Sequence, residues 1–263
     1  MRLRKLRPPL PPEHGARSLL IVGLLTPVSV GLGAGVSWTS TVLVSVLLFW
    51  LLTVGAMLFR EAVRRHGAAA GHEKRRYAVI GAVEALLVSL AIGGLVVLQG
   101  PIWALGVLAV PAVLVELRYR GQGGAGRLRG VAAGVLGLSV IAPAGAHLLG
   151  ITNPGLLGVL YALFAGYHLL ATYRVRLVVT RTRAESEIST GRWLLVPVGA
   201  VVAVLGGWSI GLIGPAGPVL FGLSTARTVH LAITSDSPPM KRLGQTEALL
   251  STLFVLGGPW LLP

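Results

Sequence analysis

The sequence contains no cysteine, and this absence removes whole classes of chemistry. Without a thiol the chain has no disulfide, no thiolate nucleophile and no cysteine-ligated zinc or iron–sulfur centre. Charged residues are also scarce, at 12% of the 263 residues, whereas soluble domains carry about 25%. With 54% hydrophobic residues and a mean hydropathy of +0.78, the composition is that of a membrane protein.

Acidic residues are the rarest charged group, at nine against 23 Lys and Arg, so the formal net charge is +14. An excess of this size can indicate nucleic-acid binding. Here, however, all 23 basic residues fall in the N-terminal tail, in alternate connections between apolar segments, or in the parts of the helices that adjoin those connections. We therefore expect no nucleic-acid partner. No small-residue cleavage site clearly ends the first apolar run, so we expect that run to be retained as a membrane helix.

Long apolar segments dominate the rest of the chain. A bilayer core of about 30 Å needs about 20 apolar residues per helix. By this rule we predict an all-α, polytopic membrane protein, with a basic tail at 1–17 and a single transmembrane domain at 18–263. The nine predicted transmembrane helices lie at about 18–36, 40–59, 78–98, 102–117, 128–149, 154–173, 193–212, 215–233 and 245–262.

The basic residues predict how this domain is oriented. Cytoplasmic connections carry the Lys and Arg of a membrane protein, and none of these residues lies in the opposite connections or at the C-terminal end. The N-terminus is therefore predicted to be cytoplasmic and the C-terminus outside, which requires an odd number of helices. We expect the chain to reside in the bacterial cytoplasmic (inner) membrane.

Few ionisable groups lie inside the predicted helices, and these are the candidates for function. Glu84 lies within the third helix, His168 within the sixth, and Glu247 near the start of the ninth. Such groups are costly in a membrane and face a polar interior or a partner. A structural pair with Arg or a hydroxyl would satisfy them equally well. No two His residues are spaced i, i+4, so we predict no metal site, and nothing in the sequence requires a cofactor.

The segment where the basic tail meets the first apolar run carries a short motif. Glu13-His14-Gly15-Ala16 follows two prolines that favour a helix start just after them. This motif resembles the opening of the YwiC-like family of bacterial membrane proteins, and Lys241-Arg242-Leu243-Gly244-Gln245-Thr246-Glu247 matches the same family pattern near the other end. The resemblance implies a multi-pass membrane architecture and no particular activity.

Nine helices with polar loops after the second and sixth also make the architecture similar to that of UbiA-type prenyltransferases. That similarity implies Asp-rich motifs on both loops, which hold magnesium against a prenyl diphosphate. Here the loops carry arginine instead, in the segments 59–66 and 173–176. Arginine binds phosphate oxygens bidentately without a metal. An anionic lipid headgroup or an isoprenoid phosphate therefore remains a plausible ligand, whereas metal-dependent transfer in its usual form is disfavoured.

These observations lead to one site hypothesis and two alternatives. The ionisable groups in the cytoplasmic half of the helices are predicted to converge on one cavity open to the cytoplasm, which binds the lipid phosphate. The hypothesis includes Glu13, His14, Arg60, Arg64, Glu84, His168, Arg174 and Glu247. The alternatives are a small-molecule transporter, with Pro27, Pro111, Pro143 and Pro197 as candidate helix breaks, and an assembly factor without chemistry of its own.

Overall fold

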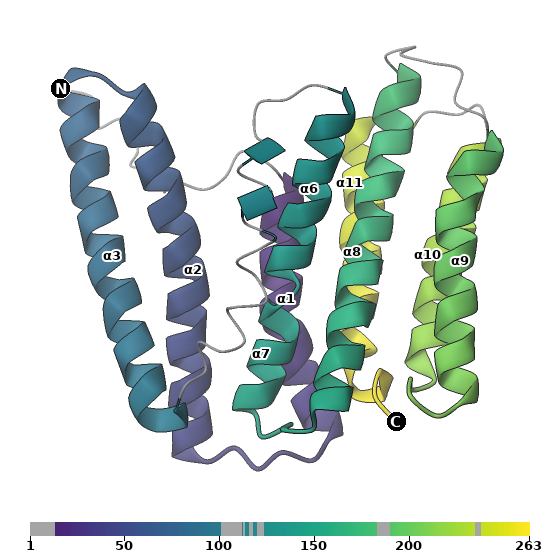
Figure 1. Cartoon of the computed structure of the whole chain (residues 1–263), viewed down its shortest axis with the longest axis horizontal. Helices are drawn as coiled ribbons and strands as arrows, with labels where there is room; N and C mark the ends of the chain where they lie inside the picture. Colours follow the sequence, from purple (N-terminus) through teal and green to yellow (C-terminus); the bar gives the residue numbers. More distant parts are fainter. Residues whose placement is uncertain are drawn as a thin grey trace. The chain divides into compact units, whose positions relative to one another are not determined.

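The computed structural model describes residues 14–100, 112, 114, 115, 118, 119, 124–182, 190–234 and 238–263, and over these residues all of its regular secondary structure is helical (Figure 1). The all-α prediction is thus confirmed for the described part of the chain. The helices are α1 (His14–Gly33), α2 (Ser40–Ala68), α3 (Gly71–Gln99), α6 (Gly124–Leu138), α7 (Ile141–Leu148), α8 (Pro154–Thr182), α9 (Thr190–Ser209), α10 (Ala216–Ile233), α11 (Met240–Leu256) and a short 3₁₀ helix, η1 (Gly258–Trp260).

Among the described residues, four helical stretches are long and apolar enough to cross a membrane. They are Ser40–Ala68, Gly71–Gln99, Arg129–Leu148 and Pro154–Val179. Two shorter apolar stretches, Leu20–Gly33 and Leu195–Ser209, match the predicted first and seventh helices, and α10 and α11 occupy the predicted eighth and ninth. The predicted helix at 102–117 lies almost entirely outside the described residues, so the total of nine stays a prediction.

The chain divides into two compact units. Unit 1 comprises Met1–Leu20 and Ser37–Trp103, and its described helices α2 and α3 form an antiparallel hairpin. Small residues let the two helices pack closely: a side chain at Gly55 would contact Val88, and one at Gly94 would overlap Leu48. The hairpin is held at both ends, because Gln99 donates to Ser45 Oγ at 2.7 Å and His66 Nδ1 lies 3.0 Å from the carbonyl of Lys74.

Most of the hairpin's apolar side chains point outward. Only 17% of the most apolar stretch of α2, and the same share of α3, is buried. Outward-facing residues include Leu47 at 63% exposure and Val97 at 83%. A continuous apolar surface of this kind is not stable against water, whereas a lipid environment solvates it.

Unit 2 comprises Ile21–Val36 and Ala104–Pro263, and α8 packs against α6, α7, α9 and α10 within it. An aromatic cluster fills its core: Tyr167 lies 4.4 Å from Phe254 and 6.5 Å from Phe221 between ring centroids, and Phe164 lies 6.1 Å from Phe254. These side chains come from α8, α10 and α11, so the cluster joins the three helices whose polar side chains Arg174, Ser224, Thr228 and Glu247 also meet.

Candidate functional sites

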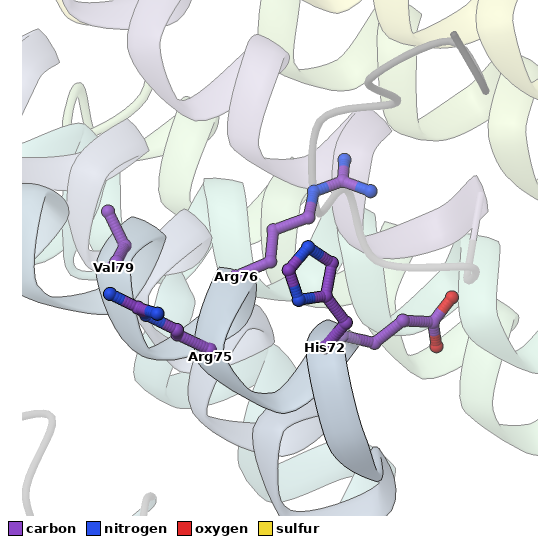
Figure 2. Close-up of a pocket in the computed structure, with 5 residues that line it drawn as sticks. His72, Arg75, Arg76 and Val79 are labelled. Carbon is purple, nitrogen blue, oxygen red and sulfur yellow. The ribbon is translucent and has the colours of Figure 1, made fainter. Parts of the chain in front are cut away.

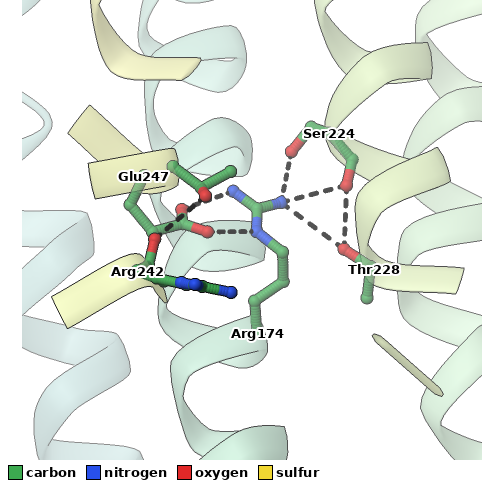
Figure 3. Close-up of polar contacts among 6 residues, drawn as sticks. Arg174, Ser224, Thr228, Arg242 and Glu247 are labelled. Carbon is green, nitrogen blue, oxygen red and sulfur yellow. Dashed lines mark hydrogen bonds and ion pairs between the residues drawn. The ribbon is translucent and has the colours of Figure 1, made fainter. Parts of the chain in front are cut away.

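The most buried charge in the described residues belongs to Arg174, whose side chain is 0% exposed. Its guanidinium lies between α10 and α11 (Figure 3). Nε and Nη2 donate to the two carboxylate oxygens of Glu247, at 2.8 and 2.7 Å. This two-point geometry is the strongest form of an arginine–carboxylate contact.

The remaining guanidinium nitrogen of Arg174 faces α10. Nη1 donates to the Ser224 carbonyl at 3.1 Å, to the Ser224 hydroxyl, and at 3.4 Å to Thr228 Oγ1. Thr228 Oγ1 in turn donates to the Ser224 carbonyl at 2.9 Å. Because each of the three nitrogens has a protein partner, Arg174 ties α8, α10 and α11 together. Binding a phosphate would require it to exchange one of these partners.

His168 occupies the core of the same unit. It lies on α8 and is 5% exposed, with the rings of Phe164 and Tyr167 at 4.5 and 5.3 Å from its own. Its Nε2 is buried and has no hydrogen-bond partner among the described residues. Such an atom is a candidate for contact with a ligand, although the neighbouring rings fill the space around the imidazole with apolar atoms.

Unit 1 carries the second group of predicted residues. Arg60 and Arg64 lie on exposed turns of α2, and Glu84 lies on α3. Arg64 donates through Nε and Nη2 to Glu61, and Arg65 also binds this carboxylate, at 2.8 Å. Glu61 is 5% exposed and neutralised by both cations. The site hypothesis does not include this carboxylate, although its i, i+3 and i, i+4 spacing to the two arginines is a signal for such pairs.

Glu84 is half-buried on the side of α3 that packs against α2. Its Oε2 faces Gly55, where an added side chain would approach it to 3.5 Å. The carboxyl group makes no hydrogen bond or ion pair with any described residue. Within the described part of the chain, Glu84 is therefore an ionisable group inside a long apolar helix without a protein partner, which is the feature that marks functional positions in membranes.

The predicted convergence of eight residues can be followed only within each unit. Arg174 and Glu247 meet directly, and His168 lies in the same core. Arg60, Arg64 and Glu84 belong to unit 1. Glu13 lies outside the described residues, and so does the side chain of His14, the first residue of α1. A single cavity shared by both units stays a prediction.

A third feature, absent from the sequence hypothesis, lies at the start of α3. A pocket of about 370 Å³ is lined by His72, Glu73, Arg75, Arg76 and Val79. In Figure 2, His72 lies near Arg76, and Arg75 near Val79, as the i, i+4 spacing of a helix requires. No group of three or more metal-ligating side chains occurs among the described residues. The guanidinium groups of Arg75 and Arg76 in this lining are donors that can bind an anion.

The chain matches no family model, no curated protein and no solved structure. The resemblances to the YwiC-like family and to the UbiA-type architecture therefore rest on sequence motifs and predicted architecture, and function has to be argued from the geometry of these sites.

Proposed function

We propose that this chain is a nine-helix protein of the bacterial cytoplasmic membrane that binds a phosphate-bearing lipid, an anionic phospholipid or an isoprenoid phosphate, at its cytoplasmic side. The observation that carries the proposal is the basic end of the α2–α3 hairpin. Six Lys or Arg and two Glu lie between residues 60 and 76, around the turn that joins the two helices. We call the basic side chains of this segment the basic rim: Arg60, Arg64, Arg65, His66, His72, Lys74, Arg75 and Arg76.

The length of the hairpin supports this position for the rim. Each helix has 29 residues, which corresponds to about 44 Å at 1.5 Å per residue. The hydrocarbon core is about 30 Å thick and the full bilayer about 40–45 Å, so the helix ends extend into the headgroup region. Basic groups at that level attract anionic headgroups by about 1 kcal/mol each.

The packing of unit 2 supports the predicted orientation. The end of α1, the α9–α10 turn and the C-terminal residues are all predicted to be outside. A side chain on Gly33 would overlap Pro259, and Gly214 N donates to the Leu261 carbonyl at 2.9 Å, so these three segments meet at one end of the unit. Arg174 and Glu247, predicted to be near the cytoplasm, meet away from them.

The test is lipid retention by the purified full-length protein. We expect phosphatidylglycerol and polyprenyl phosphate to bind more tightly at low salt than at high salt, because rim charges are screened by ions. Replacing Arg75 and Arg76 together by Gln should weaken binding of both lipids. Lys74→Gln removes one charge from the same turn but not from the pocket, and should have the smaller effect. Equal retention of both lipids by wild type and the double variant would contradict the proposal.

Transport is a second candidate function, favoured by one observation. The predicted fifth helix is interrupted at Ser139 and Val140, between α6 and α7. Interrupted helices provide free backbone groups at mid-membrane in many transporters. Here Ser139 donates its hydroxyl to the Val135 carbonyl at 2.7 Å, which already satisfies one of these groups. Phosphate-lipid binding therefore has the stronger support.

A further inference from the structure

The pocket at the start of α3 contains charges of both signs that do not neutralise each other. Arg75, Arg76 and Glu73 all line it, yet no ion pair joins them in the described part of the chain. The Nε of Arg76 is buried and has no hydrogen-bond partner among the described residues. Neighbouring charges of opposite sign on one helix turn usually pair with each other or with solvent. The Arg76 guanidinium lies over the Tyr77 ring, 5.9 Å from its centroid, so this donor is left for a ligand or water to satisfy.

The size and position of the pocket limit that ligand. A volume of about 370 Å³ is near the lower end of the range for small-molecule sites, about 300–1,000 Å³. Residues 72, 75, 76 and 79 follow the i, i+3, i+4, i+7 spacing of one helix face. The pocket therefore accepts a compact polar group along the surface of α3.

The same helix face continues as an apolar ridge. Val79, Val83, Leu86 and Leu90 follow one another at intervals of three or four residues, and all four are more than half exposed. In a bilayer, this ridge contacts acyl chains. The pocket lies at the head of the ridge, because Val79 belongs to both. A lipid whose headgroup occupies the pocket can therefore lay a chain along the ridge.

Resting on the proposed phosphate-lipid function, we infer that this pocket selects a headgroup that carries a primary ammonium next to its phosphate, as phosphatidylethanolamine does. Arg75, Arg76 and His72 supply donors for the phosphate oxygens. Glu73 supplies a carboxylate acceptor for the ammonium group. A headgroup with a phosphate alone would leave Glu73 unpaired beside an anion, and a trimethylated amine has no N–H to donate.

The experiment compares three lipids that share acyl chains: phosphatidylethanolamine, phosphatidylcholine and phosphatidylglycerol. Binding of each to the full-length protein in detergent is titrated by native mass spectrometry. For wild type we expect phosphatidylethanolamine to bind about two- to five-fold more tightly than phosphatidylcholine, the range that a solvent-accessible charge pair supports. Glu73→Gln should abolish this difference and tighten phosphatidylglycerol binding, because it removes a negative charge beside the phosphate. Lys74→Gln, the matched control outside the pocket, should preserve the ethanolamine-to-choline ratio.

The outcomes separate this inference from the function on which it rests. Equal binding of phosphatidylethanolamine and phosphatidylcholine by wild type, or an unchanged ratio in Glu73→Gln, overturns the ammonium assignment. If phosphatidylglycerol binding nevertheless falls in the Arg75→Gln/Arg76→Gln variant, the phosphate-lipid function stands. Soluble glycerophosphoethanolamine tests the source of the headgroup. It should bind more weakly than the lipid because it lacks the ridge contact, and equal affinity would identify a soluble ligand instead.

Discussion

The guanidinium of Arg174 uses all three of its nitrogens within the protein, and this fixes its role at the scale of a single residue. An arginine that is 0% exposed must have its charge compensated, and Glu247 does so through two contacts. Removing one partner of a buried pair leaves an uncompensated charge, which costs about 3–5 kcal/mol. The pair therefore behaves as a unit: it stabilises the helix arrangement only when both members are present.

The pairing of Arg174 with Glu247 leads to a stability prediction. Arg174→Gln and Glu247→Gln should each lower the melting temperature of the purified protein by several degrees. The double variant should be more stable than the sum of the single effects implies, since neither charge is left alone. Thermal unfolding followed by light scattering and intrinsic fluorescence measures this. Arg176→Gln, on the same helix and partly exposed, is the control and should change little. Strictly additive effects would show that the two side chains are energetically independent.

The sequence identified Arg174 and Glu247 as candidate site residues, but it did not predict that their side chains pair with each other. They are separated by 73 positions, and nothing local specifies which helices bring them together. Ser224 and Thr228 were not predicted as partners of Arg174 either. Hydroxyl groups in an apolar helix commonly bond their own backbone, so they carry no signal for a contact with another helix. Glu61, by contrast, could have been assigned from its spacing to Arg64 and Arg65 alone.

At the scale of helices, composition located the apolar segments but not the helix ends. The predicted spans 40–59 and 78–98 lie inside helices that run to Ala68 and begin at Gly71. Apolar runs report where the hydrocarbon core is, whereas a helix continues through polar residues into the headgroup region. At the other end of α3, Gly100 has a φ of +72° and precedes Pro101, and these two residues stop the helix where the apolar run also stops.

Some glycines lie where a side chain would overlap a neighbouring segment, and others face open space. This difference gives a prediction for unit 2. A methyl group at Gly33 would overlap the backbone of Pro259, which cannot yield as a flexible side chain would. Gly33→Ala should therefore loosen the contact between α1 and η1 and lower the melting temperature. Gly199→Ala, inside α9 with nothing within 4 Å, should be neutral or stabilising, because alanine favours helix over glycine. Equal melting temperatures for the two variants would contradict this contact.

At the scale of the whole molecule, the distribution of basic residues predicts which connections face each compartment. Reporter fusions read this directly, with an alkaline phosphatase that is active outside and a fluorescent protein that folds inside. One reversed fusion would change the number of helices, and two would overturn the nine-helix arrangement. Fusions after Gly100, Gly150 and Gly214 should report the outside, and fusions after Gly71, Gly124 and Ser235 the cytoplasm.

The last prediction can be tested by labelling a single introduced cysteine, because the chain contains no other thiol. The predicted cavity open to the cytoplasm includes Glu84 and would bring water to its side chain. We therefore expect Glu84→Cys to react with a membrane-impermeant maleimide in inside-out vesicles. Val83→Cys, one residue away on the apolar ridge, should remain unlabelled because it faces lipid, and Lys74→Cys should label fully.

The labelling rates of Glu84→Cys and Val83→Cys show whether the side chain at position 84 faces water or is packed between helices. If Glu84→Cys is as unreactive as Val83→Cys, its side chain is sealed between α2 and α3 opposite Gly55, and the cavity does not reach it. If it reacts, prior addition of phosphatidylglycerol or phosphatidylethanolamine should slow labelling only if the lipid enters the same cavity. Slower labelling would connect Glu84 to lipid binding, whereas an unchanged rate would confine the lipid to the pocket at the start of α3.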